Sequence, residues 1–231
     1  MARPHITIQG DRVALATRMA DHVESVLSDA LQARGSALLA VSGGRTPLAF
    51  FAILRARDLP WGRITVTLVD ERCVPHDHER SNTAFVRRNL LQGPAAAARF
   101  VSPVTPEGAA DLTLTLPSAI DLAHFGMGGD GHTASWFPGG DSLASALADE
   151  GAPLLELTAP GAPEPRVTFT WAALRSAGAA VLHYEGEEKA QVFAQALHPG
   201  PFSELPVRRI IHQDDVPMRV FTDTQSPEQL R

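Results

Sequence analysis

Short apolar runs alternate along this chain with segments whose apolar residues recur at the spacing of an amphipathic helix. Strands are expected at 6–8, 36–41, 64–69, 119–125, 154–157, 167–170, 179–184 and 218–221, and helices at 11–34, 48–57, 82–91, 141–148, 171–177 and 187–197. Because a helix between two strands carries the chain back along the sheet, the strands that it joins run parallel. The pattern therefore predicts an α/β fold, with an open, mostly parallel twisted sheet and helices on both faces, similar to a Rossmann sheet.

The length of the chain limits the number of domains. At 231 residues and 44% hydrophobic side chains, the chain is long enough for one domain with a substantial core. No internal repeat or long linker interrupts the pattern, although 95–115 is rich in Ala, Pro and Gly and is expected to be irregular. We therefore expect a single domain over residues 1–231.

Charge and cysteine content argue against several classes of partner. The formal net charge is −6, which disfavours a surface for nucleic acid or for an anionic membrane. Cys73 is the only cysteine, so no internal disulfide is possible and a reducing compartment is favoured. Residues 1–10 lack the apolar run of a signal peptide, and no apolar span is long enough to cross a membrane. We expect a cytoplasmic protein, a monomer or weak homodimer, with no nucleic-acid or membrane partner.

Three polar or glycine-rich segments follow the ends of expected strands, at 42–47, 70–82 and 126–135. Open α/β sheets bind their ligands at the carboxyl ends of the strands. We therefore expect the three segments to converge on one site, and this convergence carries more weight than any single motif.

The first of these segments, Ser42 to Thr46, is typical of an anion site. It precedes Pro47, which suits the first position of a helix, so that the helix dipole also favours an anion. The available donors are the amides of Gly43, Gly44 and Arg45 and the hydroxyls of Ser42 and Thr46. The Gly-Lys-Ser/Thr ending of a nucleotide P-loop is missing, which disfavours a nucleoside triphosphate. The alternative is a tight turn in which Thr46 caps the helix.

The second segment begins with Asp70-Glu71-Arg72 directly after a buried strand. The two carboxylates suit sugar hydroxyls, and the arginine suits a phosphate or an oxyanion. The alternative is a solvated cluster of charges, which the position after a buried strand disfavours. Ser81 is a good cap for the helix that follows.

The third segment places four glycines before His132, the one side chain type that titrates near neutral pH. Such a loop lets the backbone approach a ligand closely, with a general base at its rim. The glycines also satisfy Gly-x-Gly-x-x-Gly, but Asp130 would repel a pyrophosphate and the motif is not in a leading βαβ unit. The segment favours hydrolysis or isomerisation of a small anionic substrate.

Other candidate residues carry less weight. The His76-Asp77-His78 run resembles a metal pair, but a zinc site needs three or four ligands, so we expect no metal. Cys73 has no base evident nearby in the sequence, which disfavours a thiol nucleophile. Lys189 follows Gly186 at a strand-to-helix junction; alone, it is best interpreted as an exposed helix lysine.

Six motifs in the same order resemble the glucosamine-6-phosphate isomerase/6-phosphogluconolactonase family. They are Ser-Gly-Gly-x-Thr-Pro at 42–47, Asp-Glu-Arg-x-Val-Pro at 70–75, Ser-Asn at 81–82, Gly-x-Gly-x-Asp-Gly-His-Thr-Ala-Ser at 126–135, Arg-Val-Thr at 166–168 and Gly-x-x-Lys-Ala at 186–190. The resemblance covers about two thirds of the chain and is to the lactonase members, with a fold shared by the deaminase members.

This resemblance implies hydrolysis of 6-phospho-D-glucono-1,5-lactone in the pentose phosphate pathway, without a metal or cofactor. His132 is the implied general base, with Asp130 in the catalytic set and Arg72 or loop amides stabilising the oxyanion. The implied substrate contacts are Ser42, Gly43, Gly44, Arg45, Thr46, Arg166 and Lys189 for the phosphate, Asp70, Glu71 and Asn82 for sugar hydroxyls, and the loop residues Gly128 and Gly129.

Two other functions stay open at this point. A deaminase or isomerase of amino-sugar phosphates would share the three segments, but the deaminases have a Tyr after the Asp-Glu pair, where this chain has Arg72. A non-catalytic sugar-phosphate sensor would typically carry a helix-turn-helix domain, for which the α/β pattern leaves no room.

Overall fold

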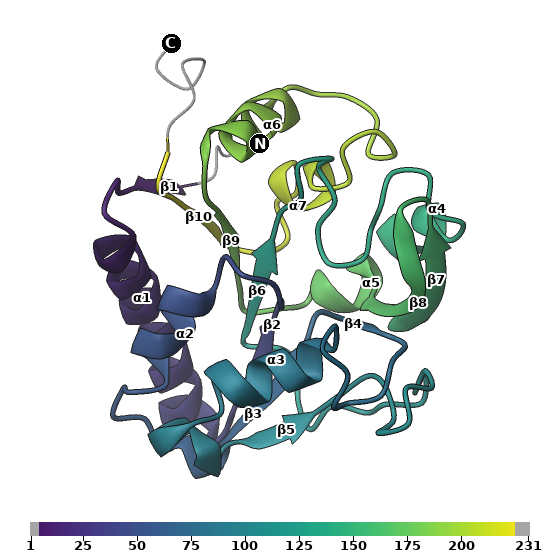
Figure 1. Ribbon diagram of the computed structural model, residues 1–231. Coiled ribbons are helices and arrows are strands. Elements are labelled where there is room, and N and C mark those ends of the chain that lie inside the picture. Colours follow the sequence, from purple (N-terminus) through teal and green to yellow (C-terminus); the bar gives the residue numbers. More distant parts are fainter. Residues whose placement is uncertain (1–4, 225–231) are drawn as a thin grey trace.

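A seven-stranded sheet forms the centre of the computed structural model, which describes residues 5–224 (Figure 1). Its order is β1-β10-β9-β6-β2-β3-β5, and every neighbouring pair is parallel. The strands are β1 (His5–Ile8), β2 (Ala37–Val41), β3 (Ile64–Leu68), β5 (Arg99–Val101), β6 (Leu122–Gly126), β9 (Ala179–Tyr184) and β10 (Met218–Thr222). The predicted parallel α/β sheet is confirmed.

Helices cover both faces of this sheet. They are α1 (Arg12–Arg34), α2 (Leu48–Leu54), α3 (Asn82–Asn89), α4 (Leu143–Leu147), α5 (Trp171–Leu174), α6 (Glu187–Leu197) and α7 (Arg208–Ile211), with 3-10 turns at Trp61–Arg63 and Gly93–Ala97. The longest, α1, begins where the Asp11 carboxylate accepts from the Val13 amide and ends at Gly35, whose φ is +75°. Glycine adopts this left-handed conformation without strain, so the predicted end of the helix is confirmed.

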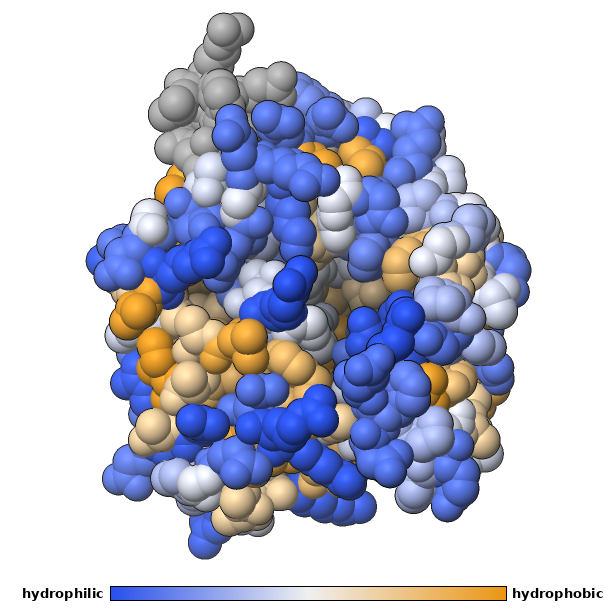
Figure 2. Space-filling view, in the orientation of Figure 1, coloured by the Kyte–Doolittle hydropathy of each residue, from blue (hydrophilic) through white to orange (hydrophobic). Residues whose placement is uncertain are grey.

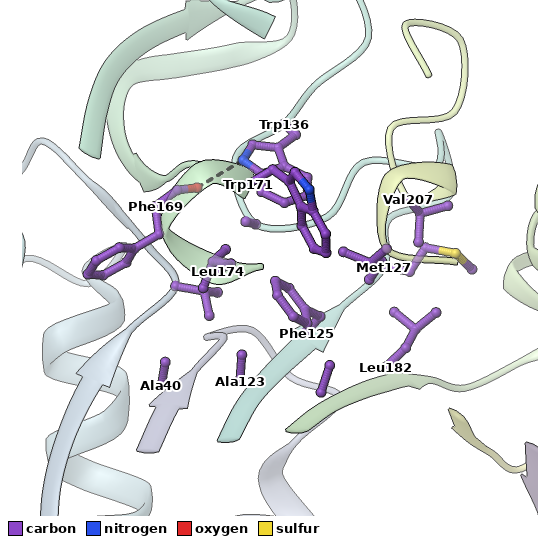
Figure 3. Close-up of a cluster of buried hydrophobic side chains, with 14 of the residues drawn as sticks. Ala40, Ala123, Phe125, Met127, Trp136, Phe169, Trp171, Leu174, Leu182 and Val207 are labelled. Carbon is purple, nitrogen blue, oxygen red and sulfur yellow. Dashed lines mark hydrogen bonds between the residues drawn. The ribbon is translucent and has the colours of Figure 1, made fainter. Parts of the chain in front are cut away.

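Alternate residues of the central strands feed two separate cores. Leu39 and Val41 of β2 pack with α1, α2 and α3, whereas Leu38 and Ala40 pack on the opposite face with α4, α5, α6 and α7. On that second face Trp136 donates its indole N–H to the Phe169 carbonyl at 3.0 Å (Figure 3). This bond fixes the loop after β6 against the second sheet.

The second sheet is small and antiparallel, in the order β4-β8-β7. It comprises β4 (Asp70–Arg72), β7 (Leu154–Ala159) and β8 (Ala162–Phe169), and Gly161 (φ +78°) lies in the tight turn of the β7–β8 hairpin. The strands expected at 154–157 and 167–170 therefore exist, but outside the parallel sheet, because a hairpin turn joins neighbouring strands only in the antiparallel sense.

The expectation for one segment needs correction. The segment 95–115, expected to be irregular, contains the edge strand β5, which pairs with β3 from Thr65 to Thr67. Its short length and alanine-rich approach hide the strand, which exists because β3 offers an unpaired edge. Within residues 5–224, no helix is long and apolar enough to cross a membrane.

Candidate active site

The carboxyl ends of β2, β6 and β9 border a cleft of about 310 Å³, closed on one side by β4 and β8. The space-filling view in Figure 2 shows a hollow near its middle, and most of the residues that border the hollow are hydrophilic. The predicted residues that line the cleft are Ser42, Gly43, Gly44, Arg45, Thr46, Asp70, Arg72, Asn82, Gly128, His132, Arg166 and Lys189. The three segments therefore converge as expected.

Ser42 to Thr46 forms the part of the cleft that follows β2, and we call it the cradle. A Cβ atom on Gly43 would collide with the Asn82 side chain, so only glycine fits there. Helix α2 begins after Pro47 without a side-chain cap, which removes the alternative that Thr46 serves as that cap. The cradle is therefore a surface of the cleft rather than a capped turn.

Two cations border the cradle. Arg45 is exposed and Lys189, in the first turn of α6, is half-buried. Neither lies within ion-pair distance of a carboxylate in the described part of the chain. Burial lowers the pKa of the Lys189 ammonium, an effect that the charges of Glu185 and Glu188 partly oppose. Both cations are available to an anionic ligand.

His132 forms a pair with Asp130 at the rim of the cleft. Its Nδ1 lies 2.5 Å from Asp130 Oδ1, and its ring contacts the Phe137 ring at a tilt of 32°, with centroids 4.2 Å apart. Partial burial raises the pKa of the Asp130 carboxyl, but the hydrogen bonds and charge of His132 outweigh it and lower that pKa. A carboxylate on Nδ1 leaves the Nε2 lone pair free to accept a proton. A Cβ on Gly128 would strike both side chains, so this glycine permits the pairing.

Two arginines of the small sheet lie side by side in the wall of the cleft. Arg72 of β4 is opposite Arg166 of β8 in the antiparallel ladder. Arg72 donates to Asn82 Oδ1 at 2.7 Å, and Arg166 Nη1 lies 3.7 Å from Asp70 Oδ2. Burial lowers the pKa of the Arg166 guanidinium, and the Asp70 charge opposes this effect. The wall therefore presents two positive charges, one of them almost completely buried.

Comparison with known proteins places this cleft in context. The family model described as "Glucosamine-6-phosphate isomerases/6-phosphogluconolactonase" matches residues 10–219. The chain belongs to this family. It is 47% identical over 218 residues to a 6-phosphogluconolactonase of Rhizobium meliloti, covering 90% of this chain and 94% of that one. It is 40% identical over 215 residues to one of Pseudomonas aeruginosa, covering 89% and 90% respectively.

Solved structures agree with this family membership. The crystal structure of a 6-phosphogluconolactonase from Shewanella baltica has a TM-score of 0.91 and 33% identity, covering 96% of this chain and 97% of that one. The family fold therefore extends over nearly the whole chain, including the segments that form the cleft.

Glu71 departs from the sugar-binding role that family resemblance implied. Its side chain is fully buried on the opposite side of β4 from the cleft, as alternation along a strand requires. The carboxylate accepts from the amides of Arg72 (2.7 Å), Asn82 (2.7 Å) and Thr83 (2.6 Å) and from the Ser81 hydroxyl (3.1 Å). Glu71 therefore anchors the start of α3, which Ser81 caps as predicted.

The glycine loop also differs in part from expectation. The Gly128 amide donates to the His132 carbonyl at 2.9 Å and is not free to bind an oxyanion. Gly129 does not line the cleft but packs on α6, where a Cβ would lie 2.8 Å from Glu188 Oε1. Asp130 also lies outside the lining and acts on the cleft through His132. Turn geometry, which a residue pattern does not specify, decides where each amide points.

Sequence reasoning missed two cleft residues, His124 of β6 and His183 of β9. Both are buried, and their ring centroids lie 5.8 Å apart. Burial, and then the nearby His183, hold the pKa of His124 well below its ordinary value. The signal available in the sequence was a histidine inside each of two otherwise apolar strands, which costs free energy unless the ring finds a partner.

The structure also bears on metal binding and on Cys73 as a nucleophile, which the sequence analysis disfavoured. Residues 5–224 hold no cluster of three or more His, Cys, Asp or Glu that could bind a metal. Burial, with contributions from Glu156 and Glu71, raises the pKa of the Cys73 thiol to about 11, so little thiolate forms at neutral pH.

Proposed function

We infer that this chain hydrolyses 6-phospho-D-glucono-1,5-lactone to 6-phospho-D-gluconate, the lactonase step of the oxidative pentose phosphate pathway. The observation that carries this inference is an imidazole backed by a carboxylate in the same cleft as a backbone anion cradle. Lactonases of the same family that are 47% and 40% identical over nearly their whole length support it.

In the proposed mechanism, His132 Nε2 accepts a proton from the water that attacks C1 of the lactone. Asp130 holds the imidazole in the required tautomer and stabilises its positive charge. The carbonyl oxygen becomes an oxyanion, which the guanidinium group of Arg72 stabilises. The bond between C1 and the ring oxygen then breaks, and the imidazolium returns its proton to that oxygen, which becomes a hydroxyl.

The remaining cleft residues are proposed to hold the substrate. The phosphate lies on the cradle with Arg45 and Lys189, while Arg166 adds positive charge from the wall. Asp70 and Asn82 line the same cleft beside the two arginines of the wall, where a sugar hydroxyl would meet them. Because the site draws on residues from 42 to 189, we assign the activity to one domain that spans the chain, whose residues 1–4 and 225–231 lie outside the described part.

The decisive test separates lactonase from deaminase. A deaminase needs a base for proton transfer between C1 and C2, and Arg72 does not serve as a base. We expect hydrolysis of the phosphorylated lactone well above its spontaneous rate, and no release of ammonia from glucosamine-6-phosphate. Both are measured on the same preparation, with a His132 variant as the background. Ammonia release above that background, without lactone hydrolysis, would refute the assignment.

Lys189→Ala is expected to raise KM for the phosphorylated lactone by roughly 10–100-fold, the value of a lost charge-assisted hydrogen bond. The unphosphorylated lactone, which has no phosphate to bind, should show almost no change. Lys189→Arg keeps the charge and serves as the matched control. Equal losses on both substrates would instead make Lys189 a structural residue.

The chain also offers a direct chemical check, because Lys189 is its only lysine. An amine-directed reagent should modify this side chain, and 6-phosphogluconate should protect it.

We also propose that the protein is cytoplasmic and that it is a monomer or weak homodimer. Cell fractionation tests the location, and sedimentation tests the oligomeric state.

A further inference from the structure

A second histidine with a carboxylate neighbour, His183, lines the same cleft as His132. The Nε2 atom of His183 lies 3.3 Å from Glu185 Oε1, and the His183 side chain is only 2% exposed. By contrast, the side chain of His132 is 31% exposed. The cleft therefore has one exposed imidazole at its rim and one buried imidazole in its floor, and each imidazole has a carboxylate neighbour.

The ring nitrogens of His183 have no hydrogen-bond partner among residues 5–224, since the contact with Glu185 lacks hydrogen-bond geometry. A buried polar atom without a partner costs free energy. Val181, two residues earlier on the same side of β9, shows that an aliphatic residue suits this face. A histidine at this place is therefore best explained by a partner that enters the cleft with the ligand.

His183 lies next to the cradle. In the ladder between β6 and β9 it is opposite Gly126, whose amide donates to the Ser42 hydroxyl at 3.2 Å. Lys189, in the helix that follows β9, lines the same cleft. An anion held by the cradle and Lys189 therefore adjoins the His183 ring.

Charged and titratable groups from five parts of the chain lie around this ring or around its partner Glu185. Glu185 follows β9, Lys189 belongs to α6, and His124 belongs to β6. Arg12 of α1 lies 3.1 Å from the Glu185 carboxylate and 3.4 Å from Asp223, which follows β10. His124 is fully buried without a carboxylate partner, so it stays neutral. A doubly charged anion would give His183 a second negative neighbour beside Glu185, which favours its charged form.

We propose that His183, supported by Glu185, takes up a proton as the substrate phosphate enters the cradle and donates a charged hydrogen bond to it. The proposal rests on the proposed function for the identity of the anion, and on the cleft alone for the site. The proton comes from the solvent, and the ring returns it when the product leaves.

Calorimetric titration in two buffers of different ionisation enthalpy tests this proposal at pH 8. Sulfate is the first probe because it carries no proton to exchange, and 6-phosphogluconate is the second. We expect the protein to take up a proton with each anion, up to about one per site, because the proposed charged hydrogen bond requires the imidazolium form of His183. His183→Leu should abolish the uptake and weaken binding by roughly tenfold or more.

Three further variants make the test specific. His183→Gln keeps a donor but takes no proton, so it should retain part of the affinity without any uptake. Glu185→Gln should reduce the uptake, and His132→Ala should keep it. His22→Leu is the matched control, because His22 lies in a separate hollow between α1 and β10. Thermal unfolding of each variant checks that it folds.

The proposal is overturned if wild-type protein binds neither probe, if it binds them without proton uptake, or if the uptake persists in both His183 variants. Turnover plays no part in this measurement. A protein that binds sulfate with proton uptake but fails to hydrolyse the lactone would refute the proposed function and leave the role of His183 intact.

Discussion

Replacing His132 by alanine is expected to lower kcat for the phosphorylated lactone by about 10²–10⁴-fold, the usual contribution of a general base. The affinity for 6-phosphogluconate should stay nearly unchanged, because the cradle and Lys189 lie on other segments than the base. Kinetics and calorimetry on the same preparation measure both quantities. Asp130→Asn should give a smaller loss of kcat, since the amide still contacts the ring but does not stabilise its charge.

The control for this experiment is His198→Ala, which removes an exposed histidine beyond the end of α6. Its kcat should equal that of the wild type. If His132→Ala kept near-wild-type turnover, the assignment of His132 as the base would be wrong, and another group in the cleft would have to activate water.

The second large effect concerns stability. Glu71→Ala is expected to lower the free energy of unfolding by about 3–5 kcal/mol, because it leaves three amides and one hydroxyl without their buried acceptor. Chemical denaturation at neutral pH measures the difference. Glu71→Gln keeps one acceptor oxygen and should lose less.

Glu79→Ala is the matched control for Glu71→Ala, because Glu79 is an exposed carboxylate in the same loop. It should change the free energy of unfolding by no more than about 0.5 kcal/mol. A similarly small change in Glu71→Ala, together with a large rise in KM, would restore the sugar-binding role that the structure disfavours.

Local signals in the sequence were sufficient to predict most of the helices and strands. The strand 179–184 and the helix 187–197 have the predicted bounds, and α1 ends at Arg34 as predicted. These features depend on periodicity and on backbone conformations that single residue types favour, so neighbours in the chain determine them. The convergence of three segments was predictable as well, because parallel strands align their carboxyl ends.

The sequence did not allow us to predict which distant strands pair with each other. The edge strand β5 exists because β3 offers it a partner, and the pairing of β4 with β8 sets Arg72 opposite Arg166. No local pattern encodes which strand lies next to which, since that choice depends on the packing of the whole core.

The site shows the same difference between local signals and tertiary packing: the sequence predicted its residue types, but not the role of each residue. The sequence by itself determined that a glycine cradle, a histidine loop and an Asp-Glu-Arg triplet follow strands of a parallel sheet. Only the tertiary structure decided that Glu71 turns away to hold α3 and that His124 and His183 form the cleft floor. The reason is physical: side-chain direction alternates along a strand, so strand register and sheet order decide which groups meet.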